Sequence, residues 1–148
     1  MSETTPVASA YKFKHAMRVR RGETDRDSVV LCSSLFSYMD VARTEYLRNL
    51  QFSYPKKWQN NFHEVVVSAS CEMKRPAHFD DELIIFAKIS AVQKSSFAFD
   101  FKIYQAAGYK LIAQATSSHV VINPKKWESV RIPDFFRESV SQFENKAL

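Results

Sequence analysis

The chain has 148 residues, of which 45% are hydrophobic and 25% charged, and this balance is typical of a single globular, soluble domain. Its two cysteines, neither with a C-x-x-C partner, exclude a disulfide framework and favour a reducing cytoplasmic compartment. No apolar run approaches the roughly 20 residues of a membrane span, so we expect no membrane partner.

The net charge is +5, and no Lys/Arg run is long enough to form a basic arm. The longest clusters are "RVRR" at 18–21 and two "KK" pairs. A moderate excess of this kind suits phosphate groups of a nucleotide as well as nucleic acid. The phenylalanines alternate within strand patterns, which predicts that they lie in the core. Aromatic rings that stack on bases would instead be exposed. We therefore expect no nucleic-acid partner.

The first ten residues, "MSETTPVASA", predict a disordered tail and lack the basic-then-apolar order of a signal peptide. Residues 11–21 then alternate, with Tyr11, Phe13, Met17 and Val19 on one face. This period of two predicts a half-buried strand, although His15 interrupts its apolar face.

From residue 34 to residue 50 the period becomes helical. Leu35, Met39, Ala42, Tyr46 and Leu50 recur at three- and four-residue steps. Further apolar residues widen this stripe past half of the circumference, so we expect a helix that is covered on several sides. Either of the preceding serines, Ser33 or Ser34, is a plausible N-cap.

Four more strand patterns follow, over 64–74, 83–92, 97–104 and 111–122, with a hairpin around Gly108. In the last of them Leu111 is in phase with alternate residues up to Val121, His119 included. Pro133 then begins a short helix. A sheet can bury a helix that is apolar nearly all round only by wrapping it. We predict an α+β chain with an antiparallel sheet of about five strands around one long helix.

An acidic cluster directly precedes this helix in the stretch "GETDRDSVVLCSSLFSYMDVARTEYL". A helix N-terminus offers unpaired N–H groups and a partial positive charge. A carboxylate can attack a carbonyl or activate water, while such donors stabilise the charge that develops on oxygen. A reacting carbonyl could lie between Asp25 and Cys32. A solvated loop acid remains the alternative for Asp25, and Glu23 and Asp27 are expected to be bystanders.

Three stretches together resemble the hotdog-fold thioesterases of the 4-hydroxybenzoyl-CoA thioesterase type. The first is the stretch quoted above, whose Asp40-Val41-Ala42-Arg43 and Glu45 look like the family's helix motif. The others are "MKRPAHFDDEL" and "AVQKSSFAFDFKIY". The resemblance covers residues 11–133 and leaves 134–148 as a short C-terminal helix and tail.

The resemblance implies an enzyme that hydrolyses an acyl-CoA thioester to a free acid and coenzyme A, as a cytoplasmic homodimer or homotetramer with sites at subunit interfaces. It makes Asp25 the catalytic carboxylate and the backbone amides of Cys32 or Ser33 the donors to the carbonyl. No cofactor is expected, since coenzyme A enters with the substrate. The alternative is a hotdog protein that binds acyl-CoA or an acyl carrier protein without turnover.

The resemblance also suggests side chains for the coenzyme A phosphates, namely Lys94, Ser95, Ser96 and Arg75. His78, in the turn "RPAHFDDE", could approach a ligand as well. None of the four histidines has the spacing of a metal site, so we expect no metal.

Two positions depart from the family pattern. Ser28 stands where the family has a glycine, and Cys32 stands where it has His, Tyr or Asn. We expect the Cys32 thiol to be a small, unreactive group, because no base lies near it in sequence.

Overall fold

The computed structural model describes residues 10–52 and 62–148. The predicted disordered tail therefore lies outside the described residues, apart from Ala10. The described elements are β1 (Phe13–Arg18), a 3-10 helix η1 (Arg21–Glu23), α2 (Cys32–Asn49), β2 (Glu64–Met73), β3 (Glu82–Val92), β4 (Ser96–Gln105), β5 (Lys110–Asn123), β6 (Glu128–Ser129) and α4 (Asp134–Glu144).

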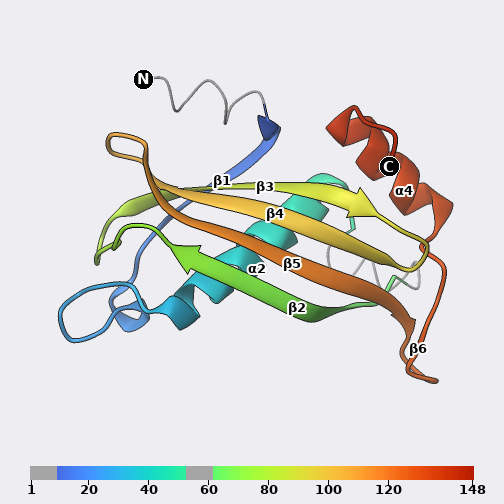
Figure 1. Ribbon diagram of the computed structural model, residues 1–148, viewed down its shortest axis with the longest axis horizontal. Helices are drawn as coiled ribbons and strands as arrows, with labels where there is room; N and C mark the ends of the chain where they lie inside the picture. The colour runs from blue at the N-terminus through green and yellow to red at the C-terminus, as the bar shows by residue number, and fades with distance from the viewer. Residues whose placement is uncertain (1–9, 53–61) are drawn as a thin grey trace.

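The strands form one antiparallel sheet in the order β1-β3-β4-β5-β2, with the two-residue β6 added beside β5. Helix α2 runs across one face of this sheet, and α4 lies at the end of the sheet where β3 finishes (Figure 1). This is the hotdog arrangement, so the predicted fold class is confirmed. We call the face that α2 leaves uncovered the outer face.

The core lies between α2 and the sheet. The side chains predicted from the helical period, Leu35, Met39, Ala42 and Tyr46, are fully buried. They face the phenylalanines of β4, Phe97, Phe99 and Phe101, which are also buried. Each side chain of this size contributes roughly 1.5–3 kcal/mol on burial. The alternation in the β4 sequence thus explains both the strand and the surface that holds the helix.

Tyr11 and Leu111 lie on the outer face of the sheet, whereas the sequence pattern predicted them on the core face. Tyr11 precedes β1 and packs on the outer face against Phe86 and Tyr104, and Leu111 joins the same cluster. The register of β4 and β5 slips between the pairs Ile103–Ala113 and Tyr104–Leu111. Such a bulge inserts one residue and turns the side chains beyond it to the opposite face.

The helix predicted to begin at Pro133 is confirmed as α4, whose N-cap is Pro133. Its Phe136 and Val140 are buried in the main core. The Tyr46 hydroxyl donates to a Glu144 carboxylate oxygen at 2.5 Å, which ties the end of α4 to the last turn of α2.

Candidate active site

The acidic stretch before α2 folds into a closed loop. The Leu31 N–H donates to the Glu23 carbonyl at 3.1 Å, and the Asp25 N–H donates to the Val29 carbonyl at 2.8 Å. At the tip, the Ser28 N–H donates to the Asp25 carbonyl at 3.0 Å. The loop therefore begins and ends beside the start of the helix and carries Asp25 near its tip.

The Asp25 side chain is fixed at one oxygen. Its Oδ1 accepts the backbone N–H groups of Asp27 at 2.9 Å and Val29 at 3.0 Å. Within residues 10–52 and 62–148, Oδ2 has no hydrogen-bond partner, and the residue is exposed. One carboxylate oxygen thus holds the loop while the other remains available to a water or a substrate.

Ser28 has a φ of 66° and so adopts the left-handed conformation that glycine favours. Position 28, where the family pattern has glycine, thus adopts a left-handed backbone although it carries a side chain. A side chain there costs roughly 1–2 kcal/mol. The departure at Ser28 consequently strains the loop without opening it.

Helix α2 begins at Cys32 with Leu31 as its N-cap, so the N-cap predicted at Ser33 or Ser34 is wrong. The Ser34 hydroxyl donates instead to the Glu23 carbonyl at 2.8 Å. No side chain caps the helix. In the described part of the chain, the N–H groups of Cys32 and Ser33 have no acceptor. Two N–H groups at the positive end of the helix dipole therefore remain available to an oxyanion.

Glu23 joins the loop to the helix, a role that the sequence pattern did not reveal. Its Oε1 accepts the Tyr38 hydroxyl at 2.9 Å and the Arg20 N–H at 2.8 Å, and its Oε2 accepts the Arg20 guanidinium. Burial opposes ionisation of Glu23, but the backbone N–H and guanidinium of Arg20 and the Tyr38 hydroxyl together keep the pKa of Glu23 below its usual range.

Of the predicted coenzyme A contacts, His78 and Arg75 lie at the same end of the sheet as Asp25. His78 forms a bridge with Val29, and its N–H donates to an Asp81 carboxylate oxygen at 2.9 Å. The neighbouring Phe79 lies under the Arg21 guanidinium, 4.1 Å from its carbon to the ring centre. The loop is thus flanked by a cation and an aromatic ring that sequence reasoning missed.

Lys94, Ser95 and Ser96 lie at the opposite end of the sheet. They follow β3, whereas the Asp25 loop contacts the segment that precedes it through Phe79, whose N–H donates to the Ser28 carbonyl at 2.9 Å. An 11-residue strand such as β3 spans about 35 Å. One chain therefore does not bring this turn to Asp25.

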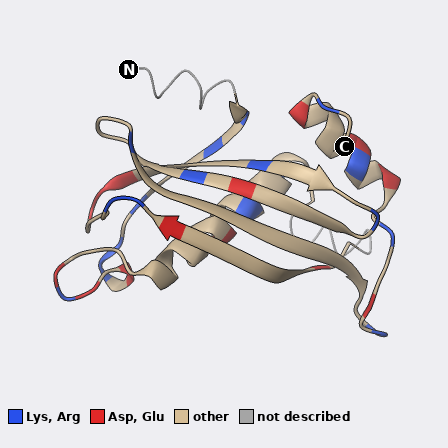
Figure 2. Ribbon diagram, in the orientation of Figure 1, with Lys and Arg blue, Asp and Glu red and all other residues tan. Residues whose placement is uncertain are grey.

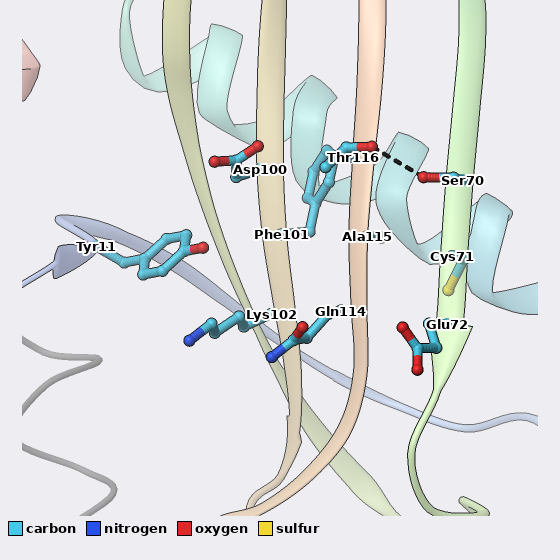
Figure 3. Close-up of a pocket in the computed structure, with 10 residues that line it drawn as sticks. All are labelled: Tyr11, Ser70, Cys71, Glu72, Asp100, Phe101, Lys102, Gln114, Ala115 and Thr116. Atoms are coloured by element: carbon cyan, nitrogen blue, oxygen red, sulfur yellow. Dashed lines mark hydrogen bonds between the residues drawn. The ribbon is translucent and has the colours of Figure 1, made fainter.

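A surface hollow of about 470 Å³ lies on the outer face and is drawn in Figure 3. Polar side chains of β2, β4 and β5 line it, and the Ser70 and Thr116 hydroxyls are hydrogen-bonded at 2.9 Å. Asp25 and the start of α2 do not contribute to it. This hollow is therefore separate from the carboxylate and the helix N-terminus.

The two cysteines are free, with Cys32 exposed and Cys71 partly buried. Burial and the nearby Cys32 raise the pKa of the Cys71 thiol. Among the residues that the structure describes, no three His, Cys, Asp or Glu side chains are grouped as a metal site requires. None of the described helices is long and apolar enough to cross a membrane.

Comparisons with known proteins agree with the fold. The 1,4-dihydroxy-2-naphthoyl-CoA hydrolase of Synechocystis is 23% identical over 134 residues, which are 90% of this chain and 97% of that protein. A crystal structure of a 1,4-dihydroxy-2-naphthoyl-CoA thioesterase from Synechocystis has a TM-score of 0.80 at 24% identity, over 86% of this chain and 94% of that one. A hypothetical protein from Aquifex aeolicus gives 0.79 at 27% identity, over 86% and 98%. The model of the thioesterase-like superfamily matches residues 19–140. The chain therefore belongs to the thioesterase-like superfamily.

Proposed function

We propose that Asp25 and the start of α2 carry out the hydrolysis of an acyl-CoA thioester by this enzyme. The Asp25 carboxylate either attacks the thioester carbonyl or removes a proton from the attacking water. The N–H groups of Cys32 and Ser33 stabilise the charge on the carbonyl oxygen. If water attacks, the C–S bond breaks to give the free carboxylic acid, and the proton taken up by Asp25 passes to the coenzyme A thiolate. If Asp25 attacks, the C–S bond breaks to give an anhydride between Asp25 and the acyl group, and water then hydrolyses this anhydride to the free acid and supplies the proton of the thiol.

The observation that carries this proposal is the combination of a fixed carboxylate and an uncapped helix start. Asp25 keeps one oxygen available while two amides hold the other, and the helix leaves two N–H groups without an acceptor in the described residues. A helix N-terminus that binds no ligand is ordinarily capped by a Ser, Thr, Asp or Asn side chain. The absence of a side-chain cap on α2 therefore favours a ligand at its N-terminus.

The substrate class follows from the superfamily and from relatives whose names specify coenzyme A thioesters. We propose that coenzyme A enters as part of the substrate and that no resident cofactor takes part. The unpaired cysteines fit a reducing compartment, and we place the enzyme in the cytoplasm.

We further propose that the enzyme is at least a homodimer that pairs through β2. This ten-residue strand forms one edge of the sheet, and its Val66 and Val67 are 48% and 57% exposed. An exposed apolar edge of this length is a template for pairing with another chain. A second copy, related by a two-fold axis, would continue the sheet through antiparallel β2 strands.

This pairing would also complete the site. The start of β2 lies beside the end of β5, next to the turn with Lys94, and the end of β2 lies near the Asp25 loop. Antiparallel pairing of two β2 strands reverses one copy relative to the other. The Lys94–Ser96 turn of the second copy therefore approaches the end of the sheet that carries Asp25. Each site would take its carboxylate from one chain and its phosphate contacts from the other.

A screen of short-chain, long-chain and aromatic acyl-CoAs tests the proposed activity, with release of the coenzyme A thiol as the readout. We expect steady-state turnover of at least one class. Tight binding of an acyl-CoA without release of thiol from any member of the panel would instead support the non-catalytic alternative.

A further inference from the structure

The backbone carbonyls of the turn between β3 and β4 are all hydrogen-bonded within the protein. Five consecutive carbonyls, from Val92 to Ser96, each accept a hydrogen bond. The donors are the Arg137 guanidinium for Val92 and Gln93, the Ile132 N–H for Lys94, the Val121 N–H for Ser95, and the Gln93 N–H for Ser96, at 2.5–3.2 Å. Each backbone carbonyl of this turn thus has a donor within the protein.

The donors of the same turn remain available. Within residues 10–52 and 62–148, the backbone N–H groups of Lys94 and Ser95 have no acceptor. The Lys94 side chain is exposed, and the hydroxyls of Ser95 and Ser96 stand beside it in sequence. Backbone N–H groups without an acceptor, with a cation nearby, form the kind of surface that binds phosphate. Blue in Figure 2 marks a Lys or Arg position on this turn.

Arg137 fixes this arrangement from a different element. It lies on α4, and its Nη1 and Nη2 donate to the carbonyls of Val92 at 3.2 Å and Gln93 at 2.5 Å. A guanidinium can donate to two neighbouring carbonyls at once because its N–H groups are held in a planar fork. The bond to Val92 is partly buried and so is less screened by water, whereas the bond to Gln93 is exposed.

We propose that Arg137 is a positioning residue for coenzyme A. By holding the carbonyls of Val92 and Gln93, it keeps the donors of Lys94 and Ser95 turned outward toward the phosphates of the substrate. Arg137 itself does not touch the thioester. The inference rests on the proposed function, because it takes the coenzyme A moiety as the ligand of this turn.

The test compares Arg137→Gln with the matched control Arg131→Gln, whose guanidinium pairs with Asp134 on the surface, where the two side chains are 66% and 73% exposed. Each variant is assayed with an acyl-CoA and with the same acyl group on N-acetylcysteamine, which has no phosphate. Binding of free coenzyme A is measured by calorimetry. For Arg137→Gln we expect KM for acyl-CoA and Kd for coenzyme A to rise about tenfold, the usual scale for losing bonds from a charged donor. We expect kcat for acyl-CoA and turnover of the truncated thioester to stay within about twofold of the parent values, and Arg131→Gln to match the parent.

Equal losses on the two substrates, or an unchanged Kd for coenzyme A, would overturn the inference, because Arg137 would then only support the fold or do nothing at the turn. Arg137→Lys provides a second variant should the glutamine variant fold poorly, and its Kd should lie between those of the parent and the glutamine variant. If the parent binds coenzyme A in the way described but hydrolyses neither thioester, the proposed function fails while the role of Arg137 stands.

Discussion

At the scale of single residues, Ser28 shows that the loop before α2 keeps a left-handed turn without a glycine. Ser28 holds φ at 66° where glycine would be unstrained. The neighbouring N–H groups of Asp27 and Val29 still reach Oδ1 of Asp25. The strain at Ser28 is therefore borne by a loop that five hydrogen bonds between residues 23 and 31 hold in place, which is common at functional sites.

Replacing Ser28 tests this account of the loop. Ser28→Gly should raise the free energy of unfolding by about 0.5–1 kcal/mol, because the relief of strain exceeds the added entropy of the unfolded chain. Ser28→Val should lower it by about 1–2 kcal/mol, since a β-branched side chain is poorly accommodated at positive φ. Urea denaturation of the two variants measures both changes. Equal stabilities of the two variants would show that the backbone at position 28 is not held in the left-handed conformation.

At the scale of elements, the most informative feature is the start of α2. Leu31 is the N-cap with φ of −70° and ψ of 145°, and Cys32 is the first helical residue. Proline is tolerated at this first helical position, and the residue before it must be extended, as Leu31 is. The position therefore allows the amide hydrogen to be removed without breaking the helix.

Cys32→Pro and Cys32→Ala separate the amide from the thiol. The alanine variant should keep most of the activity, because it keeps the N–H. The proline variant should lose about 100-fold in kcat, the scale for one oxyanion donor, while circular dichroism shows an unchanged fold. Inactivation by alanine, with acyl transfer to the Cys32 sulfur detected by mass spectrometry of the parent, would reverse the roles of thiol and amide.

The sequence predicted the elements that a local pattern of apolar residues determines. It did not predict features that depend on contacts between distant residues. Periods of two and 3.6 predicted α2 and the five long strands, because the apolar residues of each recur at the spacing of one face. In β2 this apolar face is mostly exposed. The sequence did not reveal the bulge that turns Leu111 outward or the path of Tyr11 onto the outer face. These depend on pairing with β4 and on packing against Phe86. Likewise, Ser34 reads as a cap in sequence, but Glu23, eleven residues away, accepts its hydroxyl.

At the scale of the whole molecule, the exposed β2 edge predicts assembly. Sedimentation equilibrium at low micromolar concentration should find no substantial 17.1 kDa monomer for the parent. Val67→Lys places a charge on the edge and should yield a folded monomer, since charges of this kind block strand pairing. That monomer should hydrolyse acyl-CoA at least about tenfold more slowly, because each site would lack the turn from the second chain. A fully active monomer would contradict both the interface and the shared site.

The central claim, that Asp25 carries the chemistry, is tested most directly by the turnover of Asp25→Asn on the best acyl-CoA of the panel. Asparagine keeps the shape and can still accept the N–H groups of Asp27 and Val29, so the melting temperature should change little. Without the negative charge, kcat should fall at least about 100-fold, the usual scale for losing a positioned base or nucleophile. Turnover equal to that of the parent would contradict the claim and remove Asp25 from the mechanism.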